Sequence, residues 1–334
     1  MGINFKYPAL NSKMKCMYAN NLSKYDLEEL LRQNNLKEAI NFLKVKFPSL
    51  ENLNENMHRK ELEQELNNLF IYEILKLSKY LNTDEKKIFM QFLSKYEINC
   101  VKNVFRNVTT NTDSTIYLKN IDNWTTKMFK NINGINQITE ETEFLELIKN
   151  EDYYEIFEEY ENIIENVPLQ DIEVKLDIFY FQKMYNLSKK VNKTLNYLVG
   201  TEIDLLNIIW IYRAKKYFNY PIEEIKNIII PIHYKINKKI LEELLNCSDF
   251  NELKTVLDKT IYRKVFCEET KIEYEKDKYL YDINIKIFRT KMFDISTVFC
   301  NINLIDIEIK NIINIIEGIR YKLDKSEIQK KIII

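Results

Sequence analysis

The chain has 334 residues with 49 basic and 50 acidic side chains, so its formal net charge at pH 7 is −1. Four glycines and five prolines are too few for the closely spaced turns of a many-stranded β protein, which favours an all-α fold. A total charge near zero argues against a basic nucleic-acid-binding surface. No apolar run reaches the ~20 residues needed to cross a bilayer, and the five cysteines lack C-x-x-C spacing, so we expect reduced thiols, mostly in the core.

A repeated pentapeptide is the most informative feature of the sequence. Leu-Glu-Glu-Leu-Leu at residues 27–31 recurs 214 residues later, at residues 241–245. The same kinds of residue follow both copies at the same offsets: Leu36, Glu38, Ala39 and Leu43 after the first, and Phe250, Glu252, Leu253 and Leu257 after the second. Internal repeats of this kind predict structural units that stack to bury a shared core.

Residues 62–81 have the apolar spacing of an amphipathic helix. Their apolar side chains step by three and four and therefore line one helix face: Leu62, Leu66, Leu69, Phe70, Ile74, Leu77 and Leu81. Residues 178–195 show a similar pattern. We expect about 70% or more of the chain to be helical, against about a third in an average globular protein.

A second pair of similar segments gives the length of the repeat. Residues 94–106 and 201–213 lie 107 residues apart, which is half of 214. Three units of about this length fill the chain. The predicted domains are residues 1–126, 127–225 and 226–334.

Each of these two segments opens with the pattern of a helix start. In Ser94-x-x-Glu97 and Thr201-x-x-Asp204 a hydroxyl stands where an N-cap is favoured and an acid follows three residues later, at the positive end of the helix dipole. Gly200 precedes the second of them and predicts a reversal of the chain.

The middle unit diverges and is acidic. Residues 127–225 carry 11 basic and 18 acidic side chains, a balance of −7, whereas each flanking unit has a balance of +3. Its weaker copy of the first repeat reads Leu147, Ile148, Tyr153, Glu155 and Ile156. The acidic run there is either a solvated helix face or a docking surface for a basic partner: Glu151, Asp152, Glu155, Glu158, Glu159, Glu161 and Glu165.

A polar motif recurs in the second helix of each unit. Asp204 with Asn207 and Glu308 with Asn311 both read acid-x-x-Asn, whereas Glu97 is followed by Cys100 where Asn is expected. We expect each asparagine to lie at a helix contact within its own domain and to satisfy buried polar groups. Arg106 and Arg213 are the last residues of the two similar segments, 94–106 and 201–213. The third unit has Ile305 in place of the hydroxyl, so its helix is expected to begin earlier, near residues 293–303.

Residues for catalysis, cofactor binding or metal binding are not grouped in any familiar pattern. His58 and His233 have no Cys, Asp or second His at ligand spacing. Gly-x-Ser-x-Gly, phosphate-binding glycine loops and His-Glu-x-x-His are missing from the sequence. We therefore expect no enzyme activity and no cofactor. Two alternatives stay open: a helical-repeat adaptor, whose usual period of about 34 to 47 residues differs from 107, and an all-α enzyme.

Several short motifs, taken together, resemble a known family. The segment from Glu202 to Ala214 is followed about thirty residues later by the second pentapeptide and by Thr260-x-Tyr262. With Lys13 and Lys15 near the start, where the family tends to have arginines, and with Glu308-x-x-Asn311, this order is similar to the C subunits of bacterial and archaeal V/A-type ATPases, whose counterparts in eukaryotic pumps are the d subunits. The resemblance covers nearly the full chain.

The resemblance implies a mechanical function. Members of that family are funnel-shaped, with three similar helical domains around a pseudo-threefold axis. They lie on the cytoplasmic face of the membrane rotor ring and receive the foot of the central shaft. The implied function is that of a non-catalytic rotor component, peripheral to the membrane, whose partners are the shaft and the ring. Whether such a complex transports protons or sodium ions is left open.

Overall fold

The computed structural model describes residues 7–110, 134–135, 138–158, 169–291 and 293–334. It is 75% helical, and no strand occurs within those ranges, which confirms the predicted all-α fold. The described residues divide into two compact units. The first takes them from Met1–Asn82 and Leu280–Ile334, and the second from Thr83–Thr115 and Thr125–Tyr279. The division into three domains at residues 126 and 225 stays a prediction.

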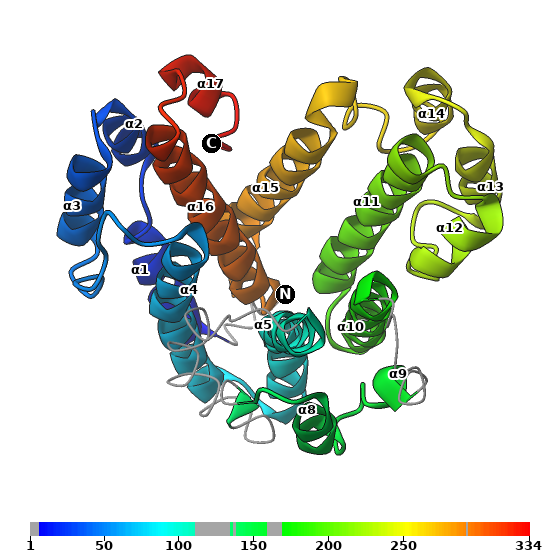
Figure 1. The fold of residues 1–334 in the computed structure, drawn as a ribbon, viewed down its shortest axis with the longest axis horizontal. Coiled ribbons are helices and arrows are strands. Elements are labelled where there is room, and N and C mark those ends of the chain that lie inside the picture. Colours follow the sequence, from blue (N-terminus) through cyan, green and yellow to red (C-terminus); the bar gives the residue numbers. More distant parts are fainter. Residues whose placement is uncertain (1–6, 111–133, 136–137, 159–168, 292) are drawn as a thin grey trace, which may run out of the picture. The chain divides into compact units, whose positions relative to one another are not determined.

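The first unit joins the two ends of the sequence. The long helix α16 (Ser296–Arg320) packs against helices from the beginning of the chain, so the blue and red segments lie side by side in Figure 1. Its start at Ser296 confirms the predicted early beginning of this helix. The other elements of the unit are α1 (Pro8–Ala19), α2 (Lys24–Arg32), α3 (Leu36–Lys46), α4 (Arg59–Leu75), η1 (Lys76–Tyr80) and α17 (Lys325–Gln329).

The second unit is built on three long helices, α5 (Thr83–Thr110), α10 (Leu169–Val191) and α11 (Lys193–Phe218). Phe105 of α5 stacks with Phe144 and Phe157 at ring-centroid distances of 5.4 and 5.1 Å, which fixes the following short helices on α5. The shorter elements are α8 (Glu141–Ile148), α9 (Glu155–Glu158), α12 (Ile222–Ile228), α13 (Lys238–Asn246), α14 (Phe250–Leu257) and η4 (Glu269–Lys271). Helix α15 (Ile272–Thr290) belongs to this unit up to Tyr279.

Both copies of the repeated pentapeptide form the first helix of a short helical pair. Ser23 caps α2 and Asn35 caps α3, and their counterparts 214 residues later, Asn237 and Asp249, cap α13 and α14. In each cap the side-chain oxygen accepts from a backbone N–H of the first turn. Three leucines of each pentapeptide are buried: Leu27, Leu30 and Leu31, and Leu241, Leu244 and Leu245.

The two predicted helix starts at Ser94 and Thr201 are wrong. Ser94 lies inside α5, where its hydroxyl donates to the carbonyl of Gln91, and Thr201 is fully buried inside α11. The helices begin at Thr83 and Lys193, and Asn192 caps the latter. Apolar residues upstream continue the helical spacing, and the packing of that face overrides a local capping pattern.

Gly200 does not reverse the chain, contrary to prediction, because it lies within α11. A Cβ atom at this position would clash with the ring of Tyr234, in the segment between α12 and α13. Glycine is therefore needed for a close approach of this segment to the helix rather than for a turn.

Candidate functional site: the polar clamps of the long helices

The two asparagines of the repeated motif make the same contact. Asn207 Nδ2 donates to the carbonyl of Ile230 at 2.9 Å, and Asn207 Oδ1 accepts from the backbone N–H of Ile230 at 2.8 Å. Asn311 holds Ile333 in the same way, at 2.7 and 2.9 Å. Both asparagines are buried. One carboxamide thus binds both backbone groups of a residue in the segment that follows the helix. The predicted contact with a helix of the same domain is wrong for Asn207, because its partner Ile230 is in a loop beyond the predicted boundary at residue 225.

Asp204, one turn before Asn207, binds the same segment, and we call these contacts between a buried polar side chain of a long helix and a neighbouring segment polar clamps. Its carboxylate accepts from the backbone N–H groups of Lys235 at 2.7 Å, Ile236 at 3.2 Å and Tyr234 at 3.4 Å. The Tyr262 hydroxyl donates to it at 2.8 Å. Burial raises the pKa of Asp204, whereas these donors act in the opposite direction. Four donors around one buried carboxylate join α11 to the segments on either side of the α13–α14 pair.

Glu308 occupies the equivalent place on α16 but has fewer partners. Its Oε1 accepts from the backbone N–H of Leu22 at 2.7 Å, just before the N-cap of α2. The side chain is buried. Burial raises the pKa of Glu308 to about 8, and the nearby Asp26 carboxylate acts in the same direction.

The first copy of the motif has lost its asparagine and uses a tyrosine. Glu97 is buried on α5 and accepts from the Tyr153 hydroxyl at 3.1 Å. Burial, together with the charge of Glu151, raises the pKa of Glu97 to about 7. Cys100, which stands where the other copies have asparagine, is buried as well. The clamp of this copy is therefore a hydrogen bond between α5 and the segment before α9.

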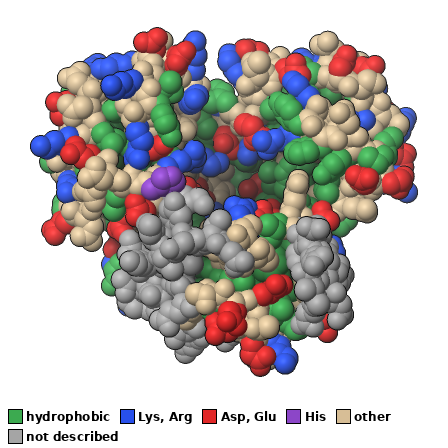
Figure 2. Space-filling model, in the orientation of Figure 1, with side chains coloured by type: hydrophobic (Ala, Val, Ile, Leu, Met, Phe, Trp, Pro, Cys, Tyr) green, Lys and Arg blue, Asp and Glu red, His purple; other side chains and the backbone are tan. Residues whose placement is uncertain are grey.

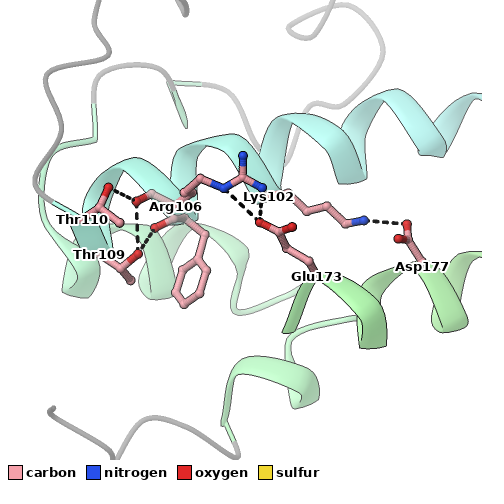
Figure 3. A network of polar contacts seen from close by, with 7 residues as sticks. Lys102, Arg106, Thr109, Thr110, Glu173 and Asp177 are labelled. Carbon is pink, nitrogen blue, oxygen red and sulfur yellow. Dashed lines mark hydrogen bonds and ion pairs between the residues drawn. The ribbon is translucent and has the colours of Figure 1, made fainter. Parts of the chain in front are cut away.

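The two predicted arginines each pair with an acid on another long helix. Arg106 of α5 binds Glu173 of α10, and one turn earlier Lys102 binds Asp177 at 2.5 Å (Figure 3). Arg213 of α11 pairs with Glu273, in the first turn of α15, at 3.2 Å. These pairs run along the helix contacts and align the long helices, although their partial exposure limits each to about 0–1 kcal/mol.

The acidic run in residues 151–165, predicted as a candidate docking surface, lies only partly within the described residues. Glu155 and Glu158 are exposed on α9, whereas Glu151 is half-buried and acts on Glu97. Glu159 and Glu161 lie outside the described residues. On the face in Figure 2, basic and acidic side chains are interspersed, as a net charge of −1 leads one to expect.

The cavities of the described structure contain no familiar catalytic arrangement. One of about 850 Å³ lies between α5 and α10, with lysines at its edge and Glu97 in its wall. Another, of about 290 Å³, is lined by His58, Arg59 and the end of α16. In the part of the chain that the structure describes, no group of three His, Cys, Asp or Glu residues is placed to hold a metal ion.

Comparison with known proteins decides the family. Residues 10–331 match the family described as ATP synthase (C/AC39) subunit. The chain belongs to this family. The resemblance inferred from the repeated motifs is thereby confirmed.

Two relatives of this C/AC39 chain are archaeal proteins of low identity, both C subunits of A-type ATP synthases. The relative from Methanosphaera stadtmanae is 26% identical over 162 residues, 44% of this chain and 42% of the relative. The relative from Methanocaldococcus jannaschii is 23% identical over 349 aligned positions, 98% of this chain and 86% of the relative.

Sequence reasoning found the acids and asparagines but missed most of their partners. Leu22, Ile230 and Ile333 contribute backbone groups, for which side-chain identity carries no signal. Tyr262 was visible in the Thr260-x-Tyr262 motif, but its distance of 58 residues from Asp204 gave no reason to join the two. Glu173 and Asp177, i and i+4 on one helix face, could have been recognised as partners for a basic helix.

Proposed function

We propose that this chain is a non-catalytic central-stalk component that couples the central shaft to the membrane rotor ring of a V/A-type ATPase. The observation that carries the proposal is the family match across residues 10–331. In this function the ATP-hydrolysing and ion-conducting residues belong to other subunits, and the chain transmits torque between shaft and ring.

The polar clamps support a mechanical function. Asp204, Asn207, Glu308 and Asn311 are all buried and hold backbone segments against the long helices. A coupling protein has to resist shear between its helices, and buried hydrogen-bonded networks fix a single arrangement of the backbone. The same residues are engaged in structure, so none of them is available for acid–base chemistry on a substrate.

Contact with the membrane would be made through the complex. None of the described helices is long and apolar enough to cross a membrane. We therefore propose a cytoplasmic position on the rotor ring, peripheral to the lipid.

We further propose that the exposed acids Glu155 and Glu158 steer a basic surface of the shaft or of a protein bound to it. Both lie within residues 127–225, the segment whose net charge is −7. Complementary charge increases the rate of encounter between two proteins more than their final affinity.

The experiment that tests this function is a purification from native membranes with an affinity tag on this chain. Identification of the copurifying proteins should recover the shaft and ring subunits in fixed proportion. Recovery of the tagged chain without them, from membranes that do contain the ATPase, would contradict the proposal.

A further inference from the structure

Glu308 is a buried acid with too few partners for a charge. Its side chain is 6% exposed, and one backbone N–H, that of Leu22, donates to it. Leu22 precedes the capping residue Ser23 of α2. The carboxyl group therefore joins the middle of α16 to the start of the α2–α3 pair, which packs on the same helix.

Asp204 is the matched comparison within the chain. It has the equivalent place beside the α13–α14 pair, but three backbone N–H groups and the Tyr262 hydroxyl donate to it. Four donors replace much of the hydration that a carboxylate loses on burial, whereas one does not. The two acids thus hold equivalent helical pairs with different capacities to remain ionised.

No cation balances Glu308 among the described residues. The charged side chain whose field acts on it is Asp26 of α2, which is itself negative and opposes ionisation. Three lysines on the other helices that pack against α16 have partners elsewhere: Lys46 of α3 pairs with Asp26, Lys13 of α1 with Glu73 of α4, and Lys325 of α17 with the carbonyl of Arg32. Glu65 of α4 is half-buried and acidic, so it adds no positive charge.

We propose that protonated Glu308 is a latch that holds the α2–α3 pair on α16, and that loss of this proton in weakly alkaline solution loosens the pair. The carboxyl O–H bond breaks and the proton passes to water. The carboxylate left behind has one N–H donor, and it gains hydration only when the start of α2 moves away from α16. This inference concerns the fold and does not rest on the proposed coupling function.

The sign of the pH dependence follows from the pKa of Glu308. Burial raises this pKa to about 8 from the ordinary value of 4.5, which applies in the unfolded chain. Between these two values the folded state holds the proton and the unfolded state does not, so stability falls as pH rises, by up to about tenfold in the folding equilibrium constant per pH unit. Below the lower value and above the higher one this group adds no further slope.

Hydrogen exchange across a pH range of about 7 to 9 tests the latch without any substitution. After correction for the intrinsic exchange rate, amides of α2 and α3 should lose protection by about tenfold or more. Amides of α13 and α14, next to Asp204, should not. Constant protection of α2 and α3, or an equal loss in both helical pairs, would overturn the proposal.

A Glu308→Gln variant gives the second measurement. Glutamine keeps the acceptor for the Leu22 N–H and cannot ionise, so the α2–α3 amides should keep their protection near pH 9. In denaturant unfolding the variant should match the parent near pH 5 and exceed it near pH 8 by about 400-fold in the equilibrium constant. Glu65→Gln on α4 is the control and should leave the loss of α2–α3 protection unchanged. The same loss in Glu308→Gln as in the parent would refute the latch.

Discussion

At the scale of single residues, Asn207 and Asn311 each commit both ends of one carboxamide to the backbone of one residue. A leucine of similar size would fill the space and leave the backbone N–H of the partner residue buried without its acceptor. An unsatisfied buried polar group costs more than a typical hydrogen bond gains. These positions are therefore more sensitive to a change of chemistry than to a change of size.

Replacement of Asn207 by Leu should lower the free energy of unfolding by about 1–3 kcal/mol, because the backbone N–H of the fully buried Ile230 loses its acceptor, whereas the Ile230 carbonyl keeps the N–H of Ile232 as a donor. Denaturant midpoints of variant and parent measure the change. Asn251→Leu, at an exposed position on α14, is the control and should stay within about 0.5 kcal/mol of the parent. Coincident midpoints for Asn207→Leu and the parent would show that the clamp does not contribute to stability.

Gly200 tests how closely the loop after α12 must approach α11. Alanine favours a helix over glycine by about 1 kcal/mol, but its Cβ would clash with the ring of Tyr234. We expect Gly200→Ala to lower stability by about 1–3 kcal/mol, as overpacking does. The double variant with Tyr234→Ala should recover part of that loss, measured as a positive coupling in a double-mutant cycle. A stabilised Gly200→Ala would mean that the loop yields freely.

At the scale of helices, the sequence predicted which segments are helical better than where the helices begin. The apolar stepping of residues 62–81 spans α4 and η1, and the repeated pentapeptides are α2 and α13. Ser94 and Thr201 failed as helix starts because the capping pattern is local, whereas packing along α5 and α11 extends the helices upstream. Of each buried hydrogen bond, the sequence could predict only the side chain on the long helix. The partner is often a backbone group, such as the N–H of Leu22, 286 residues from Glu308, and the sequence contains no signal for it.

The exposed acids of helix α9 are proposed to steer a basic surface of the shaft or of a protein bound to it. Replacement of Glu155 and Glu158 by Gln should slow association with the purified shaft at low salt, because both acids are exposed. Near 1 M salt, where the Debye length is about 3 Å, the rates of variant and parent should agree. The matched control is Glu224→Gln with Glu242→Gln, which removes the same charge from exposed positions on α12 and α13. Equal association rates for all three proteins at low salt would leave α9 as a solvated face.

At the scale of the whole molecule, helices from the early and the late parts of the sequence pack together in the first unit. The last long helix, α16, packs on the first helical pair, α2–α3, as α11 packs on α13. The α2–α3 pair thus has the same kind of contact with α16 as α13 has with α11. The pseudo-threefold arrangement and its boundaries near residues 126 and 225 stay predictions.

The most direct test of the central claim uses membrane vesicles that contain the ATPase depleted of this chain. ATP hydrolysis and ATP-driven ion uptake are measured before and after the purified chain is added back. A non-catalytic coupling protein should restore ion uptake, while the chain alone hydrolyses no ATP. Ion uptake that is already complete in the depleted vesicles, or hydrolysis by the isolated chain, would contradict the account.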